Sequence, residues 1–319
     1  MTLPPLKIVF LGAGEFALPT LERLAAEFPA ENLLVVSQPD RARGRGRKKA
    51  ATPVSLKARE LGLKLLTPKN VNSPESRAVM EEFAPDYLVL VDFGTRLAPE
   101  TIALPKKAAI NLHPSLLPAY RGPAPMAWAL IRGEPVTGVT TQLISEKIDC
   151  GSILIQDPTF IRDHETLPEL SRRLSEIGAP LVIATLEGLE SGELEPRPQD
   201  ESLASKAPKF RKEDGLINWQ DDAAAIFNRI RGLNPWPGTY TFHRGKRTKI
   251  LRARPLAEPL LLPPVPGELR ADGERLLVGC GQNSVLEILE LQPAGKPVRT
   301  AAQFIHGRQL KQPDHFSAG

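Results

Sequence analysis

The fold of this 319-residue chain is decided by the stretch Leu6-Lys-Ile-Val-Phe-Leu-Gly12, which continues as Ala-Gly14-Glu-Phe-Ala17. An apolar run closed by glycine and followed by a helical pattern as far as Phe28 predicts a buried strand that turns into a helix. Further apolar runs alternate with helical patterns, which is typical of a doubly wound, mostly parallel, Rossmann-like α/β sheet. The expected strands are at 33–37, 64–66, 86–91, 108–113, 138–144 and 152–160, and the expected helices at 53–61, 74–83 and 166–189.

The composition changes after the last of these helices. Residues 191–200 are polar and proline-bearing and offer little to bury, so we interpret 190–208 as a linker. A helix is expected at 221–231, and short apolar runs separated by turns then predict a small β-barrel or sandwich. The expected strands of this part are at 239–243, 248–254, 267–270, 275–278 and 284–291. The domains are therefore expected at 1–189 and 209–319.

Composition and charge limit the class of protein. The two cysteines, Cys150 and Cys280, have no metal-ligand spacing and make no disulfide framework, so we expect a reducing compartment and no metal. With no leader pattern at the N-terminus and no membrane-length apolar stretch, we expect a cytoplasmic protein. The net charge is +4, and residues 209–319 carry 17 Lys or Arg against 11 Asp or Glu. This basic region indicates either a polyanion contact, such as nucleic acid, or a solvated surface.

The glycine turn Gly12-Ala-Gly14-Glu-Phe-Ala17 fits the G-x-G-x-x-A form of the dinucleotide fingerprint. That interpretation also requires an acidic residue about 20 positions further on, and neither Glu31 nor Asp40 lies clearly at the tip of the second strand. Glycines at a tight strand-to-helix turn are equally expected for structural reasons. Nicotinamide binding is therefore one alternative and a structural turn is the other.

The stretch 41–49 contains six cations in nine residues, interspersed with glycine. Without apolar periodicity it should be a flexible loop, and its side chains could bind phosphates and become ordered on binding. It follows directly on the second strand, at the edge where open α/β sheets bind ligands. A solvated loop without a partner is the alternative.

Asn111 and His113 are two residues apart at the end of a predicted strand, so their side chains share one face. A polar pair that closes an apolar strand is poorly explained by packing, and Pro114 and Pro118 stiffen the loop that follows. These residues therefore indicate a catalytic or binding site. Asp149, in Ile148-Asp-Cys-Gly151, is by itself an ordinary turn residue.

The motif Asn111-Leu-His-Pro-Ser-Leu-Leu-Pro-Ala-Tyr-Arg-Gly122 resembles the signature of the folate-dependent formyltransferases, and Asp149 matches the catalytic aspartate of that family. Further motifs resemble the members that act on initiator tRNA charged with methionine. These motifs are Gln38-Pro-Asp-Arg41 with its basic loop, Thr52-Pro-Val, Arg231-Gly-Leu-Asn-Pro-Trp-Pro237 and Leu291-Gln-Pro-Ala-Gly-Lys296, so the resemblance spans nearly the whole chain.

The resemblance implies that the formyl group of 10-formyltetrahydrofolate is transferred to the amino group of methionine on initiator tRNA. For this reaction we hypothesise that Asn111 donates to the oxyanion. We expect His113 to stabilise the oxyanion when protonated and to move the proton to the leaving folate nitrogen, and Asp149 to orient the imidazole and favour its cation. The folate residues that the resemblance implies are Phe93, Gly94, Ser115, Leu116, Leu117 and Pro118. The tRNA residues it implies are Arg41, Arg43, Arg45, Arg47 and Lys48. An OB-like C-terminal barrel should add phosphate contacts.

The resemblance implies no nicotinamide and no membrane, and nothing in the sequence demands more than a monomer. The chain departs from the family pattern at Gly12-Ala-Gly14, at Asp92-Phe93, at Cys150 and at Thr141-Gln142, where an apolar pair is usual. Three alternatives to the function implied by the resemblance stay open. They are a formyltransferase acting on an amino sugar or another small amine, a nicotinamide oxidoreductase, and an RNA-binding protein without catalysis.

Overall fold

The computed structural model describes residues 5–43, 48–257, 264–308 and 314–318. The chain forms two compact units, which are described separately. The N-terminal unit comprises Met1–Pro125, Val136–Phe160 and Pro168–Ala207. The C-terminal unit comprises Met126–Pro135, Ile161–Leu167 and Pro208–Gly319. The second unit thus takes in two short segments that precede it in sequence.

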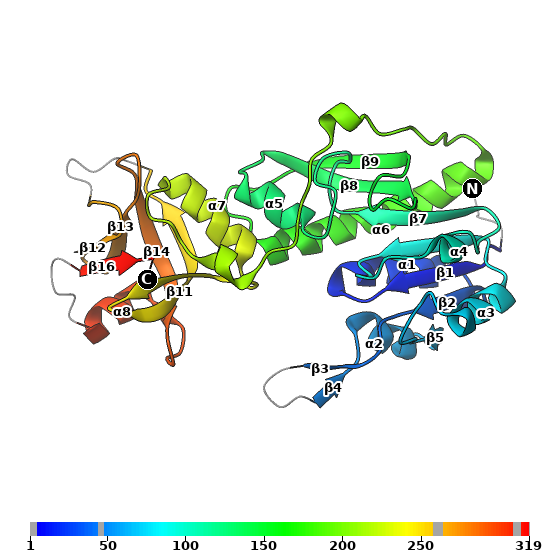
Figure 1. Cartoon of the computed structure of the whole chain (residues 1–319), viewed down its shortest axis with the longest axis horizontal. Coiled ribbons are helices and arrows are strands. Elements are labelled where there is room, and N and C mark those ends of the chain that lie inside the picture. Colours follow the sequence, from blue (N-terminus) through cyan, green and yellow to red (C-terminus); the bar gives the residue numbers. More distant parts are fainter. Residues whose placement is uncertain (1–4, 44–47, 258–263, 309–313, 319) are drawn as a thin grey trace. The chain divides into compact units, whose positions relative to one another are not determined.

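The N-terminal unit is built on a seven-stranded sheet (Figure 1) with the order β5-β2-β1-β6-β7-β8-β9. Its first five strands in this order are parallel, whereas β7–β8 and β8–β9 pair antiparallel. This confirms the prediction of a mostly parallel sheet. The strands are β1 (Ile8–Gly12), β2 (Leu33–Val36), β5 (Lys64–Leu66), β6 (Tyr87–Val91), β7 (Ala108–His113), β8 (Val136–Leu143) and β9 (Ile153–Phe160).

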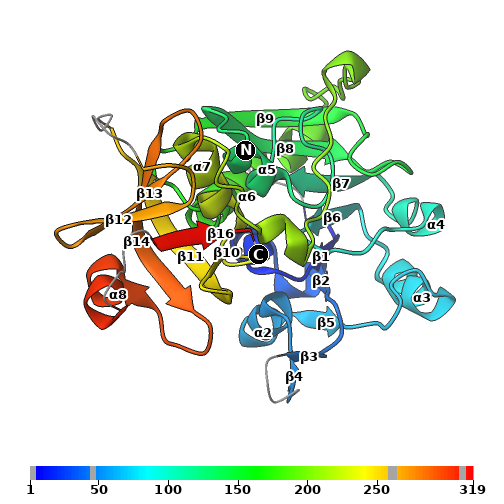
Figure 2. The same ribbon diagram turned by 60° about the vertical axis from the view of Figure 1, so that its left-hand side comes forward.

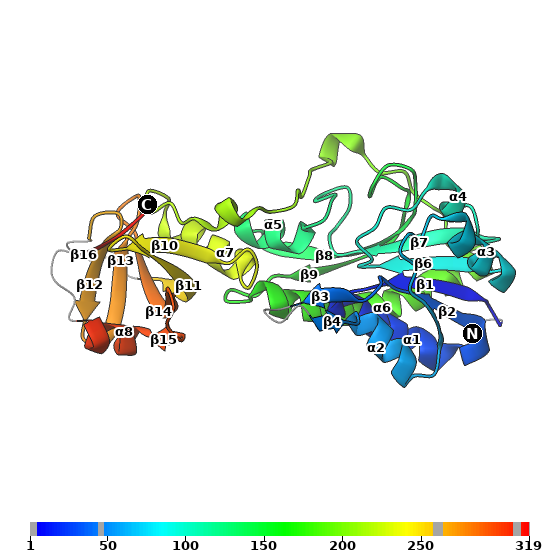
Figure 3. The ribbon, with the colours of Figure 1, turned by 60° about the horizontal axis from the view of Figure 1, so that its bottom comes forward.

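Helices cover both faces of this sheet (Figure 3). One face packs on α3 (Pro74–Phe83) and α4 (Pro99–Ile102) through an apolar cluster that includes Met80 and Phe83. The opposite face carries α1 (Leu18–Glu27), α2 (Pro53–Glu60) and α6 (Leu167–Ser191). The side chains of Thr52 and Ser73 cap α2 and α3 by accepting backbone N–H groups, which explains where these helices begin.

The register of β7 sets the direction of its side chains. Asn111 lies opposite Leu90 of β6 and Gln142 of β8, and the strand ends at His113. Because side chains alternate along a strand, Asn111 and His113 point to one face and Leu112 points to the other. There Leu112 contacts α6 so closely that a Cβ added to Gly178 would stand 2.6 Å from its Cδ2. Asn111 and His113 therefore lie on a strand whose opposite face packs against the core.

The basic stretch is not the wholly flexible loop that its sequence predicts. Its flanks form the short strands β3 (Arg41–Arg43) and β4 (Lys48–Ala50), which pair antiparallel as a hairpin. The glycines and the lack of apolar periodicity predicted a mobile loop. Two short strands can pair through their backbones without apolar periodicity, so the sequence pattern did not indicate this hairpin. Residues 44–47 lie outside the described part of the chain.

The C-terminal unit is an antiparallel barrel whose strands follow the order β11-β10-β16-β12-β13-β14, with β15 beside β14. Pairing of β11 with β14 closes it, and β16 lies between β10 and β12 (Figure 2). This confirms the barrel alternative over the sandwich. The strands are β10 (Thr239–His243), β11 (Lys246–Pro255), β12 (Glu268–Asp272), β13 (Arg275–Gly279), β14 (Val285–Pro293), β15 (Arg299–Thr300) and β16 (Asp314–Ser317).

The described part of this unit contains the helices α7 (Ala223–Leu233) and α8 (Ala301–Arg308). It also contains α5 (Pro125–Ile131) from its second residue onward. An apolar cluster around Ile230, Ile250 and Phe304 fills the barrel and joins it to α7. Short 3-10 turns at Glu15–Ala17, Ala30–Asn32, Glu201–Leu203 and Lys212–Gly215 complete the elements. Among the helices described, none has the length and apolar character to cross a bilayer.

Candidate active site

The site is built where β7 ends. Asn111 is 9% exposed and His113 is 5% exposed, so both side chains are largely buried. Among the described residues, no hydrogen bond involves the side-chain amide of Asn111, and its atoms are not among the fully buried unpaired ones, so solvent reaches them. An amide held rigidly on a strand and not used internally is available to donate to a ligand.

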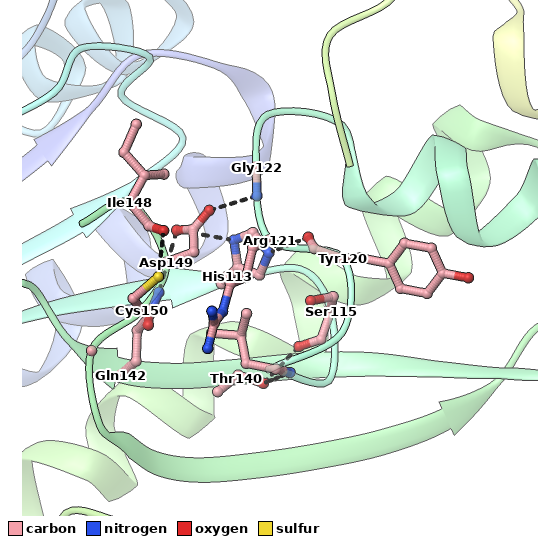
Figure 4. A network of polar contacts seen from close by, with 12 residues as sticks. His113, Ser115, Tyr120, Arg121, Gly122, Thr140, Gln142, Ile148, Asp149 and Cys150 are labelled. Atoms are coloured by element: carbon pink, nitrogen blue, oxygen red, sulfur yellow. Dashed lines mark hydrogen bonds and ion pairs between the residues drawn. The ribbon is translucent and has the colours of Figure 1, made fainter. Parts of the chain in front are cut away.

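The imidazole of His113 is oriented by a backbone group (Figure 4). Its Nε2 lies 3.1 Å from the carbonyl oxygen of Tyr120. Because a carbonyl can only accept, Nε2 must carry the proton and donate. The other nitrogen, Nδ1, faces Asp149 Oδ1 at 3.6 Å, which is an ion-pair distance and longer than a hydrogen bond. Nδ1 is therefore the nitrogen that can exchange a proton.

Asp149 follows β8 in a left-handed backbone conformation, with φ 55°. The Gly122 N–H donates to its Oδ2 at 2.8 Å, and Gln142 Nε2 donates to its Oδ1 at 3.3 Å. Gly122 itself has φ 122°, and a side chain there would meet the carbonyl oxygen of Ala207 at 2.8 Å. The glycine that ends the sequence motif is thus required for this backbone conformation and for the close approach of Ala207.

The loop after His113 is fixed by hydrogen bonds from neighbouring strands. Thr140 Oγ1 donates to the carbonyl of Ser115 at 2.6 Å and accepts from the backbone N–H of Leu117 at 3.1 Å. Gln156 Nε2 donates to the Leu117 carbonyl at 2.9 Å. The expected folate residues Ser115 to Pro118 therefore form a preorganised rim immediately after the polar pair.

The other expected folate residues, Phe93 and Gly94, follow β6, the strand next to β7. Phe93 is buried and its carbonyl accepts a hydrogen bond from Gln38, while Gly94 has φ 71°. The carboxyl ends of β6 and β7 lie at the same edge of the sheet because the strands are parallel. The structure thus brings both predicted groups of folate residues to this edge.

Asp92 occupies the place where the sheet reverses its strand order, between β1 and β6. A Cβ added to Gly14 would stand 1.8 Å from Asp92 Oδ2, so the second glycine of the turn makes room for this carboxyl. The surrounding protein displaces water and raises the pKa of Asp92 to about 6. A carboxylate at this position would repel a pyrophosphate, which argues against the dinucleotide interpretation of the glycine turn.

The remaining departures from the family pattern have structural partners. Thr141 Oγ1 lies 2.7 Å from Thr185 Oγ1 and so connects β8 to α6. The Cys150 thiol donates to the carbonyl of Ile148 at 3.3 Å. Gln142 accepts a hydrogen bond from Gln199 at 3.3 Å in addition to donating to Asp149.

Sequence reasoning assigned no role to Gln142, Gln199 or the Tyr120 carbonyl. Gln142 and Gln199 contact each other although they are far apart in sequence, and the Tyr120 carbonyl is a backbone atom. Residue type therefore gives little indication of any of these roles. For the expected tRNA residues, the structure places the backbones of Arg41, Arg43 and Lys48 in the hairpin and does not describe their side chains. Arg45 and Arg47 lie outside the described residues.

Taken together, a neutral amide donor, an imidazole with one available nitrogen and a carboxylate converge at a sheet edge where α/β proteins bind ligands. Such a set suits acyl transfer through a tetrahedral oxyanion. The comparisons give the class: residues 6–186 match the family model described as formyl transferase. Residues 209–309 match the model of the formyl transferase C-terminal domain.

Similar curated proteins specify the family. The chain is 42% identical to "Methionyl-tRNA formyltransferase" of Geobacter sulfurreducens, covering 96% of this chain and 95% of that protein. It is 40% identical to the protein of the same name from Thermodesulfovibrio yellowstonii, covering 97% of this chain and 99% of that one. The chain therefore belongs to the methionyl-tRNA formyltransferase family.

Solved structures share the fold. An N-formyltransferase from Helicobacter canadensis, in complex with folinic acid and dTDP-3-aminofucose, matches with a TM-score of 0.70 and 17% identity over 90% of this chain and 99% of that one. HypX from Aquifex aeolicus, in complex with tetrahydrofolic acid, matches with a TM-score of 0.63 and 21% identity. That match covers 97% of this chain and 48% of HypX. At these identities the likeness concerns the fold.

Proposed function

We propose that this enzyme transfers the formyl group of 10-formyltetrahydrofolate to the α-amino group of methionine on initiator methionyl-tRNA, for translation initiation. The observation that carries the proposal is that Asp149 lies 3.6 Å from His113, which shares one face of β7 with Asn111. The relatives that match this chain over nearly their full length are named methionyl-tRNA formyltransferase, which supports methionyl-tRNA as the acceptor.

In the proposed mechanism, the neutral amine of methionine attacks the formyl carbon, and the carbonyl becomes a tetrahedral oxyanion. An α-amino group has a pKa of roughly 8, so a useful fraction is neutral near physiological pH. The Asn111 amide donates to the oxyanion without bringing a charge into the site. Because the amide is held on β7, its donation costs little reorganisation.

Proton transfer is assigned to His113 Nδ1. The amine loses a proton as the new C–N bond forms, and the folate nitrogen gains one as its C–N bond breaks, so one proton moves between two nitrogens. Nε2 stays bonded to the Tyr120 carbonyl throughout, which leaves Nδ1 to carry the proton. Asp149, 3.6 Å away, stabilises the imidazolium that forms when Nδ1 is protonated.

The finer assignments belong to the same proposal. Phe93, Gly94 and the Ser115 to Pro118 loop bind the folate donor, and the hairpin that contains Arg41, Arg43 and Lys48, together with Arg45 and Arg47, meets the tRNA. Residues 1–189 form the catalytic domain and 209–319 the tRNA-binding domain, and the linker 190–208 connects them while its segment 197–207 packs on the N-terminal unit. The enzyme acts as a monomer in the cytoplasm, with no resident metal and no nicotinamide.

The test is transfer of labelled formyl from 10-formyltetrahydrofolate to methionyl initiator tRNA, with uncharged tRNA and free methionine as controls. Label found only on the charged initiator tRNA would support donor, acceptor and reaction together. Turnover of the folate with label on amino sugars and none on tRNA would contradict the proposed acceptor. Quenching of protein fluorescence by NADH would instead favour an oxidoreductase.

A further inference from the structure

The segment 197–207, which sequence reasoning treated as linker, is hydrogen-bonded to the active-site loops. Arg197 and Ile153 of β9 exchange two backbone hydrogen bonds of 2.8 Å. The Arg121 N–H donates to the carbonyl of Ser205 at 2.8 Å, and the Ala207 N–H donates to the Arg121 carbonyl at 2.7 Å. The segment therefore has a fixed position against both loops that build the site.

Gln199 is the side chain that this segment directs to the site. Its Nε2 donates to the backbone carbonyls of Asp149 at 2.9 Å and Gly151 at 2.7 Å, and it lies 3.3 Å from Gln142 Oε1. Its Oε1 accepts from Arg121 Nε at 3.0 Å and Nη2 at 2.7 Å. Since arginine only donates and carbonyls only accept, these partners fix the direction of the amide.

One of the two carbonyls that Gln199 holds belongs to a residue under conformational constraint. Asp149 has a positive φ, which a residue other than glycine rarely adopts unless its surroundings hold it there. Gln142, the third partner, donates to the Asp149 carboxylate, and Figure 4 shows it beside Asp149 and Cys150. The Gln199 amide thus contacts both the backbone of Asp149 and the side chain that directs its carboxylate.

We propose that Gln199 is a positioning residue for formyl transfer, because its amide N–H groups hold Asp149 so that the carboxylate faces His113 Nδ1. The inference rests on the proposed function, in which Asp149 and His113 act on the reacting atoms. Gln199 itself touches no reacting atom in this scheme. Its loss should therefore lower turnover and leave the binding of both substrates nearly unchanged.

Three variants of the full-length enzyme test the proposal. Gln199→Ala removes both ends of the amide, whereas Gln199→Glu keeps the oxygen that accepts from Arg121 and replaces the donor by an acceptor. Both should lower kcat by about ten- to a hundredfold, since misplacement by about 1 Å can cost a hundredfold. KM for the folate and for charged tRNA should stay within about threefold, because ground-state binding is not altered.

Asp200→Ala is the matched control on the same segment. The Asp200 carboxylate is exposed and accepts from the Ser202 N–H at 2.9 Å and from its hydroxyl at 2.7 Å, without contact to the site. Its kcat should stay within about twofold of the parent, as is usual for surface substitutions. A urea unfolding curve for each variant establishes that the rate is measured on folded protein.

The outcomes separate the inference from the function on which it rests. An unchanged kcat in Gln199→Ala, a Gln199→Glu variant as active as the parent, or a higher KM with normal kcat would each overturn the positioning role. If Gln199→Ala does not fold, the folded Gln199→Glu variant decides alone. A fully active Asp149→Asn would instead refute the catalytic assignment, whereas an inactive Asp149→Asn beside an active Gln199→Ala would leave that assignment standing.

Discussion

Asp92→Asn should stabilise the N-terminal unit at neutral pH and have little effect near about pH 4. The carboxyl lies over Gly14, and its pKa is raised to about 6, whereas an unfolded aspartate has a pKa of about 3.9. Between these values the folded chain keeps a proton that the unfolded chain releases. The free energy of unfolding therefore falls as pH rises through this window, and the whole penalty is present above about pH 6.

The size of the effect follows from the shift. A difference of about two pKa units corresponds to about 3 kcal/mol between the protonation states. The side chain is nevertheless reached by solvent, so screening should reduce the penalty to about 1 kcal/mol. Asparagine keeps the shape of the side chain without the charge. It should therefore raise the free energy of unfolding by about this amount at pH 8 and by less at pH 5.

The assay is urea unfolding of the parent and the variant at both pH values, followed by far-ultraviolet circular dichroism. Asp157→Asn, at an exposed position on β9, is the control and should give the same small difference at both pH values. An Asp92→Asn variant that is no more stable than the parent at pH 8, or equally stabilised at both pH values, would refute the reasoning. Measurement without substrates keeps folate binding out of the comparison.

Three further predictions concern catalysis, packing and tRNA binding. Asn111→Ala should lower kcat by about a hundred- to a thousandfold, because an oxyanion donor is removed, and a decrease below about tenfold in single-turnover assays would contradict this role. Gly178→Val should destabilise the fold by about 1–3 kcal/mol in urea unfolding, because even a Cβ there meets Leu112 at 2.6 Å; an unchanged midpoint would contradict that packing. Replacing the loop residues Arg43, Arg45 and Arg47 together by serine should weaken tRNA binding. The salt dependence of binding should fall by about one unit of slope for each phosphate that is no longer neutralised. An unchanged slope in binding titrations would exclude a role of these side chains in tRNA binding.

The sheet could be predicted because its strands carry a local signal. The expected strand at 108–113 and the expected helix at 74–83 coincide with β7 and α3, since apolar runs and a Ser-Pro helix start mark them. The strand β16 and the helix α8 were missed. Four residues such as Asp314 to Ser317 show little periodicity, and β16 exists because β10 and β12 bind it on both sides.

Prediction of the candidate site had a similar limit. Asn111 and His113 could be found because a polar pair at the end of an apolar strand is visible in the sequence. Asp149 required a resemblance, since its turn is ordinary by itself. The Tyr120 carbonyl could not be found from residue type, because any residue supplies a backbone oxygen.

The hydrogen bonds of segment 197–207 have a consequence for how such proteins can recombine. The match to the N-terminal family model ends at residue 186, but the partners of Asp149 and Arg121 extend as far as Ala207. A gene fusion that exchanged the C-terminal region at residue 186 would import a foreign segment in place of Gln199 and Ser205 into the neighbourhood of the reaction. Fusions that keep the enzyme active should therefore join the two parent sequences after residue 207. The exchanged C-terminal region, which is proposed to bind the acceptor tRNA, should begin at that point.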